Sequence, residues 1–219
     1  MFKDRRDAGA RLAVELSGFA GRVDVITLGL PRGGVPVAFE VARSLEVSLD
    51  VFLVRKLGVP GNPELAMGAV ASGGIRVLNQ EIVGALGIPE QAVEEATARE
   101  MEELRRRERE FRGERPFPDV EGHTLLLIDD GLATGASMRA ALKALETRGP
   151  ARVVVAVPTA PHEVCDSFRR EHVDVYCLEN PVPFYGVGGS YENFEQQSDQ
   201  EVKDLLEEYR RLSGGSERA

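Results

Sequence analysis

Apolar runs that alternate with segments of helical period place the strongest constraint on the fold of this chain. Five runs rich in Val, Ile and Leu are expected to form strands, at residues 23–30, 49–54, 124–128, 153–157 and 173–178. Their nearly continuous apolar character is typical of parallel strands that helices cover on both faces. Amphipathic segments are expected to form helices at residues 5–19, 35–45, 89–112, 137–148, 162–171 and 199–212. This alternation predicts an α/β fold, an open and mostly parallel sheet with helices on both faces.

Charge and composition exclude several classes of protein. The 219 residues include 27 basic and 36 acidic side chains, a formal net charge of −9, which does not favour nucleic acid or anionic membranes as partners. The chain has no run of about 18 apolar residues, and its charged first residues do not resemble a signal peptide. We therefore expect a cytoplasmic protein that binds no nucleic acid and no membrane. Cys165, Cys177 and the three histidines lack the spacing of a zinc site.

One segment carries most of the chemical information. Residues 125–137 read LLLIDDGLATGAS, a buried strand that ends in Asp129 and Asp130, followed by a turn of small residues before a helix. In open parallel sheets, ligands bind at the carboxyl ends of the strands. The turn offers backbone amides and a helix dipole to a phosphate group, and adjacent acids suit the hydroxyls of a ribose. The alternative is that the acids only cap the turn. The chain lacks the GxxxxGK[ST] loop of phosphate-loop NTPases.

This segment resembles the phosphoribosyl-pyrophosphate (PRPP) signature of the type I phosphoribosyltransferases, in which four aliphatic residues precede two acids and Ala-Thr-Gly-x-Ser. The resemblance implies that Asp129 and Asp130 bind the ribose hydroxyls. The loop that would bind the 5′-phosphate comprises Gly131, Leu132, Ala133, Thr134, Gly135, Ala136 and Ser137. Gly131 departs from the family, which usually has an aliphatic residue there, so a looser turn is expected. The DDGLATG form and the sequence RKLGVPGNPELAMGA resemble a bacterial branch whose substrate is unassigned.

Two further elements match the family's pyrophosphate site. The sequence LGLPRGGVPVA supplies a loop after the first core strand, in which Arg32, Gly33 and Gly34 would contact pyrophosphate, often through a non-proline cis peptide. Glycine lets the backbone approach a ligand closely. Arg55 and Lys56 end the next strand and are expected to bind the same group. Residues 56–74 are rich in Gly and Pro, which predicts a mobile loop instead of a packed element.

The resemblance implies a glycosyltransferase of nucleotide metabolism and nucleoside salvage, which transfers the 5-phosphoribosyl group from PRPP to an acceptor, expected to be a nucleobase. Magnesium would be held mainly by PRPP, with no dedicated protein ligands. The catalytic candidates are Asp129, Asp130, Arg32, Arg55, Lys56 and the loop acid Glu64. Ala133 occupies the position of the base-contacting acid of 6-oxopurine enzymes, which disfavours hypoxanthine and guanine. The alternatives are a regulatory protein that binds PRPP or a nucleotide without transfer, and an enzyme that uses water or a non-base acceptor.

Residues 1–178 are expected to form the core, with a helical insertion near 80–112. Residues 179–219 would add a loop and a helix that contribute to a small variable hood over the base. Four aromatic side chains in this part are candidates to stack on the base: Phe184, Tyr185, Tyr191 and Phe194. The alternative is that these rings form a satellite core under their own loop. Because dimers are usual in the family, a homodimer is also expected.

Overall fold

The computed structural model describes the backbone of residues 1–214, and their side chains except those of Pro63 and Glu64. The chain divides into two compact units, which are described separately. The first comprises residues 1–51, 120–135 and 150 onward, and the second comprises residues 52–119 and 136–149. The predicted division into a core of residues 1–178 and an addition of residues 179–219 remains a prediction. No helix within residues 1–214 has the length and apolar character needed to cross a membrane.

The first unit is built on a parallel five-stranded sheet of order β2-β1-β6-β7-β8. Its strands are β1 (Val25–Gly29), β2 (Ser48–Val51), β6 (Thr124–Ile128), β7 (Arg152–Thr159) and β8 (Asp174–Glu179). Every residue of β1 and β6 is buried, as the continuous aliphatic runs predict. The predicted open parallel sheet is therefore confirmed.

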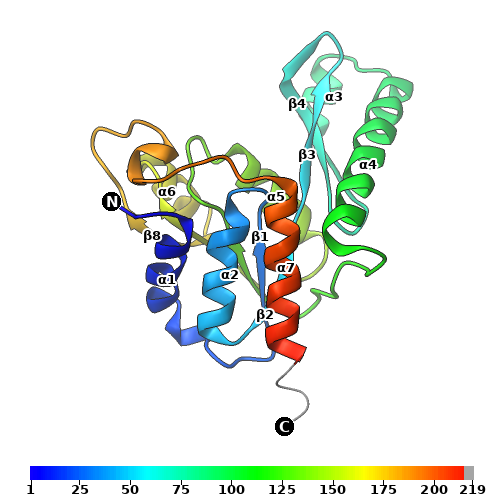
Figure 1. Cartoon of the computed structure of the whole chain (residues 1–219). Helices are drawn as coiled ribbons and strands as arrows, with labels where there is room; N and C mark the ends of the chain where they lie inside the picture. The colour runs from blue at the N-terminus through cyan, green and yellow to red at the C-terminus, as the bar shows by residue number, and fades with distance from the viewer. Residues whose placement is uncertain (215–219) are drawn as a thin grey trace. The chain divides into compact units, whose positions relative to one another are not determined.

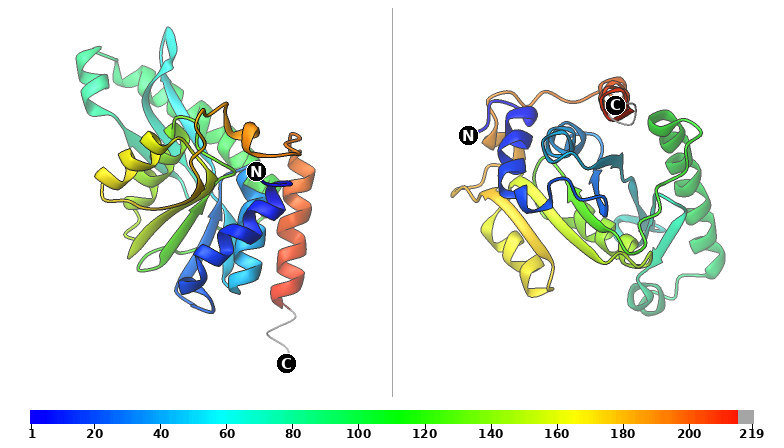
Figure 2. Two further views of the ribbon diagram at one scale, coloured as in Figure 1. Left: turned by 90° about the vertical axis from the view of Figure 1, so that its left-hand side faces the viewer. Right: turned by 90° about the horizontal axis from the view of Figure 1, so that it is seen from below.

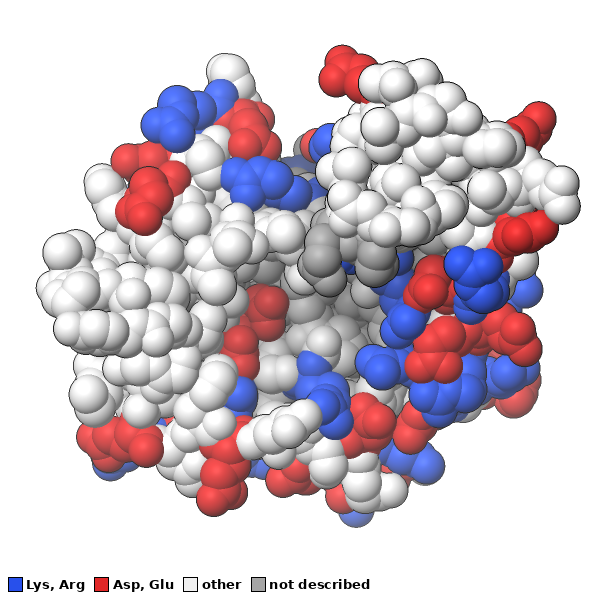
Figure 3. Space-filling view, turned by 90° about the horizontal axis from the view of Figure 1, so that it is seen from above, with Lys and Arg blue, Asp and Glu red and all other residues white. Residues whose placement is uncertain are grey.

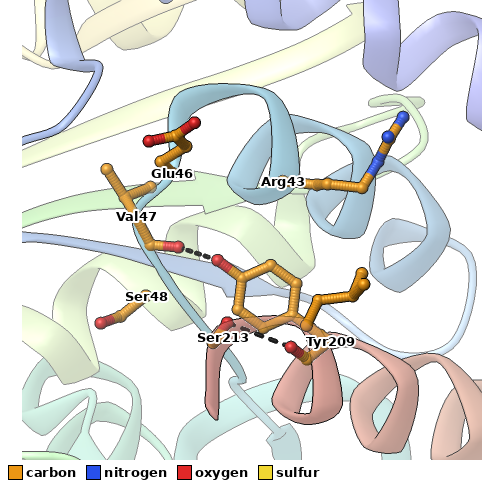
Figure 4. Close-up of a pocket in the computed structure, with 7 residues that line it drawn as sticks. Arg43, Glu46, Val47, Ser48, Tyr209 and Ser213 are labelled. Carbon is orange, nitrogen blue, oxygen red and sulfur yellow. Dashed lines mark hydrogen bonds between the residues drawn. The ribbon is translucent and has the colours of Figure 1, made fainter. Parts of the chain in front are cut away.

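Helices cover both faces of this sheet. They are α1 (Arg5–Glu15), α2 (Gly34–Leu45), α6 (His162–Arg170) and α7 (Asp199–Gly214), with short 3-10 turns at Ser17–Phe19 and Val187–Ser190. Helices α1, α2 and α7 lie side by side on one face (Figure 1), and α6 lies on the other (Figure 2). A hydrogen bond joins α7 to the residue before β2, because the hydroxyl of Tyr209 donates to the carbonyl of Val47 (Figure 4).

The order of the strands reverses between β1 and β6. From β1 the chain passes through α2 outward to β2, whereas from β6 the sheet continues in the opposite direction to β7 and β8. Gly29 of β1 pairs with Ile128 of β6, so the segments that follow these two strands leave the sheet next to each other. Such a reversal is where open α/β sheets bind their ligands.

The second unit carries a small antiparallel sheet of order β3-β4-β5. Its elements are β3 (Val54–Val59), β4 (Asn62–Ala71), β5 (Ile75–Leu78), α3 (Gln80–Ala85), α4 (Glu90–Arg112) and α5 (Ala136–Glu146). This sheet is the small addition to the core that the fold class predicts. It also corrects the prediction of an unpacked loop at residues 56–74. Pro60 and Gly61 only form the connection between β3 and β4, and Leu57, Met67 and Val70 of these strands are buried.

Arginines of α4 form ion pairs with glutamates of the same helix. Arg106 forms ion pairs with Glu103 and Glu110, and Arg107 forms one with Glu103. Acidic and basic side chains are also intermixed over the face of the molecule shown in Figure 3. These pairs are typical of a solvated helix face and do not suggest a basic patch for nucleic acid.

Candidate active site

Asp129 and Asp130 follow β6 directly and are half-buried at the carboxyl edge of the sheet. The amide of Asp130 donates to Oδ1 of Asp129 over 2.9 Å. Burial raises the pKa of Asp129 well above its ordinary value, and the neighbouring charge of Asp130 raises it further. Burial also raises the pKa of Asp130, but the guanidinium of Arg5 opposes this rise. Two adjacent carboxyl groups at this edge are suited to hydrogen-bond a pair of vicinal hydroxyls.

The loop after β1 lies against the acid pair. A Cβ on Gly33 would be 2.6 Å from Cγ of Asp130, and one on Gly34 would be 2.6 Å from the carbonyl oxygen of Ile128. Gly33 and Gly34 are expected to make room for a ligand. Because they lack side chains, they also make room for the acid pair that follows β6. The peptide bond between Pro31 and Arg32 is cis, the form that the resemblance describes for this loop.

Arg32 is placed on the same loop as the two glycines. Its Nη1 lies 3.9 Å from Oδ1 of Asp199, the first residue of α7, and both side chains are 35% exposed. This long, solvent-accessible pair is weak. A ligand phosphate could therefore replace Asp199 as the partner of Arg32 at small cost.

Arg5 belongs to the site and was missed by the sequence analysis. Its Nε donates to Oδ2 of Asp130 over 2.8 Å, and its Nη1 donates to the carbonyl of Glu195 over 2.8 Å. The guanidinium carbon lies 3.9 Å from the ring centroid of Phe194. No local signal could have identified Arg5, because it is 125 residues from Asp130 and resembles any cation of an amphipathic helix.

The turn after the acids is tightly packed at its start and open further on. Gly131 is buried, and a Cβ there would lie 2.6 Å from Cγ1 of Val187 and 2.9 Å from Cγ2 of Thr159. The expected looser turn is therefore wrong, because glycine here allows closer packing. Leu132 is also buried, and its amide donates to the carbonyl of Thr159 over 2.9 Å.

The later residues of the turn include the exposed Ala133 and Thr134, and Gly135 has a φ of 74°. Ala136 and Ser137, both exposed, begin α5. The accessible residues of the predicted phosphate turn are thus Ala133, Thr134, Ala136 and Ser137, whereas Gly135 is buried.

Arg55 and Lys56 lie on β3 in the second unit. Nε of Arg55 is 2.6 Å from Oε2 of Glu100 on α4, and Lys56 is exposed. Both basic residues line a cleft of about 720 Å³ between the β3–β4 hairpin and α4. The backbone of Glu64 is part of β4, and its side chain lies outside the described part of the chain. A common role of these residues with the acid pair remains a prediction.

The four candidate aromatic residues separate into two groups. Tyr191 is buried, donates to the carbonyl of Asp130 over 2.6 Å, and lies with its ring centroid 5.0 Å from that of Phe194. These two rings form the satellite core that was the alternative to a base pocket. Tyr185 is 84% exposed and Phe184 is half-buried, so both remain candidates to contact an acceptor.

The described side chains bring together no three His, Cys, Asp or Glu residues that could hold a metal ion. Of the two carboxyl groups that precede the predicted phosphate turn, that of Asp130 already accepts a hydrogen bond from Arg5 at Oδ2. That magnesium is held mainly by PRPP remains a prediction.

Comparisons with known proteins show the family of this chain. Residues 3–187 match the family model described as Phosphoribosyl transferase domain. The protein of Mycobacterium tuberculosis strain H37Rv named Putative phosphoribosyl transferase Rv0571c is 44% identical over 207 residues, which are 94% of this chain and 46% of that protein. The chain thus spans about half the length of the curated relatives it matches. The crystal structure of TT1426 from Thermus thermophilus is 46% identical with a TM-score of 0.83, over 95% of this chain and 99% of that one. Because the family model covers the sheet, the acid pair and both loops beside it, this chain belongs to the phosphoribosyl transferase family.

Proposed function

We propose that the chain transfers the 5-phosphoribosyl group of PRPP to an acceptor, expected to be a nucleobase, and releases pyrophosphate. The observation that carries this proposal is the packing of the Arg32–Gly34 loop against Asp129 and Asp130 where the strand order reverses. A ligand there would meet carboxylates on one side and the cation of Arg32 on the other. PRPP needs this combination, because it carries ribose hydroxyls next to two phosphorylated positions.

The acid pair would fix the ribose ring, and residues 131–137 would bind the 5′-phosphate. The bond from C1 of the ribose to pyrophosphate then breaks as the acceptor attacks, with positive charge developing on the ring. Catalysis of this kind depends on positioning and on electrostatic stabilisation, so no nucleophilic side chain is required.

The departing pyrophosphate would be stabilised by Arg32, Arg55 and Lys56 and by the backbone of Gly33 and Gly34. Magnesium bound to PRPP would supply further neutralisation of that charge. The β3–β4 hairpin is proposed to exclude water from the reacting centre, which protects an activated ribose from hydrolysis. Glu64 on this hairpin is the candidate general acid.

The acceptor is proposed to lie against Phe184 and Tyr185, since Tyr191 and Phe194 are already packed. Ala133 disfavours 6-oxopurines, because it places no acid near N7 of such a base. We also expect a cytoplasmic homodimer, which sedimentation of the purified protein would test.

Titration calorimetry of PRPP with and without magnesium tests the donor site. The wild type is expected to bind only with magnesium, and the Asp129→Asn, Asp130→Asn double variant is expected to lose binding. A matched control is the Asp166→Asn, Asp174→Asn variant, which removes the same charge at more accessible positions of the first unit. Equal loss in the control, or no binding by the wild type, would refute the proposal.

A regulatory protein that binds PRPP or a nucleotide without transfer is the second candidate. The acid pair and the turn that follows it would serve this candidate equally, because binding without transfer uses the same contacts. Release of pyrophosphate during a screen of bases separates the two candidates. Release indicates the transferase, and binding with no release for any base indicates the regulator.

A further inference from the structure

The guanidinium of Arg5 is held on three sides at the edge of the candidate site. Its side chain is 8% exposed, and that of Asp130 is 14% exposed. Asp130, the carbonyl of Glu195 and the ring of Phe194 surround it. A buried charge is costly unless it is paired and hydrogen-bonded. These three contacts therefore give Arg5 one position and direct one edge of the guanidinium at Asp130.

The segment that carries Arg5 is anchored to residues 190–193 by backbone hydrogen bonds. The amide of Phe2 donates to the carbonyl of Ser190 over 2.8 Å, and the amide of Glu192 donates to the carbonyl of Phe2 over 2.8 Å. In Figure 1 these two segments, blue and orange, lie side by side. Tyr191, which lies within residues 190–193, donates a hydrogen bond to the carbonyl of Asp130. Residues 190–193 therefore contact the backbone of Asp130 directly, and they also anchor the segment whose Arg5 contacts its carboxylate.

Other titratable groups around this pair are mostly acidic. Those that face it from the packed elements are Asp129 of the same turn, Tyr191 of residues 190–193, Glu179 at the end of β8, and Glu201 of α7. Arg5 is the cation that lowers the pKa of Asp130, against the larger effect of burial. Without Arg5, the effect of burial on the pKa of Asp130 would lose the cation that opposes it.

We propose that Arg5 is a positioning residue of the donor site, which keeps the carboxylate of Asp130 ionised and turned toward the ribose hydroxyls. This inference rests on the proposed function, because it assigns those hydroxyls to Asp130. It makes the amino-terminal segment a part of the site, although that segment carries none of the family's motif residues.

The consequence for pH follows from the sign of the interaction. An ionised Asp130 accepts hydrogen bonds from hydroxyls, so binding of PRPP is present above the pKa of Asp130 and is lost as the pH falls through it. Removal of Arg5 raises that pKa further. The loss of binding therefore begins at a higher pH in a variant without the guanidinium.

Three variants separate the effect of the charge of Arg5 from the effects of its orientation and of the stability of the fold. Arg5→Gln removes the charge, and Arg5→Lys keeps it but cannot make all three contacts. Arg6→Gln is the matched control, because Arg6 is the next residue of the helix, is 52% exposed and pairs with Glu40 away from the acid pair. We expect Arg5→Gln to bind magnesium PRPP about 10- to 100-fold more weakly at neutral pH, the loss expected for one hydrogen bond between charged groups. Arg6→Gln should bind as the wild type does.

The readout that a structural role alone would not move is the titration of Asp130. Carbon-13 NMR of aspartate carboxyl groups, assigned with Asp130→Asn, follows that titration without PRPP. Arg5→Gln should raise the pKa of Asp130, and Arg5→Lys should leave it close to the wild-type value while still weakening PRPP binding. If Arg5→Gln does not fold, Arg5→Lys alone tests the orientation.

Two results would overturn the inference. One is a folded Arg5→Gln variant with an unchanged pKa of Asp130 and unchanged affinity, and the other is an Arg5→Lys variant that binds as tightly as the wild type. If the wild type itself binds no PRPP, the proposed function fails, and the NMR titration still decides whether Arg5 controls Asp130.

Discussion

Replacing Gly33 by alanine tests the fit between the loop after β1 and the acid pair. Gly33 has a φ of −63° and a ψ of −31°, which alanine adopts without strain. The substitution therefore acts through its methyl group alone. That carbon would lie 2.6 Å from Cγ of Asp130 and 3.2 Å from Nε of Arg5, against ordinary contacts of about 3.5–4.0 Å. The carboxylate must move, or the loop must.

The size of the effect follows from the burial of the ion pair. Arg5 and Asp130 are 8% and 14% exposed, so solvent screens their interaction little. Loss of a hydrogen bond between charged groups costs about 1.5–3 kcal/mol, and separation of a buried pair costs about 3–5 kcal/mol. Because the carboxylate can turn partly aside, we expect Gly33→Ala to lower the free energy of unfolding by about 2–4 kcal/mol. PRPP binding should weaken in parallel.

Urea denaturation followed by circular dichroism measures this change by linear extrapolation. Gly18→Ala is the matched control, because a Cβ at Gly18 has no atom within 4 Å. The control should change the free energy of unfolding by less than about 0.5 kcal/mol. A loss below about 1 kcal/mol in Gly33→Ala, with PRPP binding intact, would refute the reasoning that this glycine makes room for Asp130.

Three other substitutions test separate contacts. Glu100→Gln releases Arg55 from a partly exposed ion pair, and calorimetry should show pyrophosphate binding about two- to fivefold tighter. Asp129→Asn removes a carboxyl group whose pKa is raised in the folded state. The cost of ionising such a group appears as the pH rises through its folded pKa, so thermal unfolding should show a variant more stable than the wild type at neutral pH, with the gain lost in acid. Tyr191→Phe removes the donor to the carbonyl of Asp130 and should lower the free energy of unfolding in urea by about 1 kcal/mol.

Each of these substitutions has its own control or contrary result. Glu94→Gln breaks an exposed pair with Arg76 in the second unit and should leave pyrophosphate binding unchanged, so equal tightening would indicate a general charge effect. A gain in Asp129→Asn that persists at acid pH would contradict the assigned pKa direction. Tyr185→Phe, at a side chain 84% exposed, should not alter stability.

The sequence predicts the parallel sheet well, because strands buried on both faces consist almost entirely of apolar residues. The aliphatic runs that become β1 and β6 are buried along their whole length, and β6 begins and ends at the residues expected. The acid pair and the loop at Arg32 follow from the same logic, since both come directly after such strands. Local sequence carries this information.

The hairpin of the second unit could not be predicted in the same way. Its glycines and prolines are typical of loops, and Gly68 lies in β4 where a Cβ would meet Leu78 of the neighbouring strand. The requirement for glycine there arises from the pairing of strands, which the sequence does not display. Gly131 was misjudged for the same reason, because its neighbours Thr159 and Val187 are distant in the chain.

The pairing of residues 2–5 with residues 190–195 has a consequence for synthesis. Arg5 leaves the ribosome well before the carbonyl that holds it, because that carbonyl belongs to Glu195, 190 residues later. Contacts between residues so far apart form only after the intervening chain is available. A nascent or truncated chain that ends before residue 190 would therefore contain every motif residue of the family and still lack the clamp on Asp130. During translation, this chain therefore contains its signature sequence before its site can be assembled.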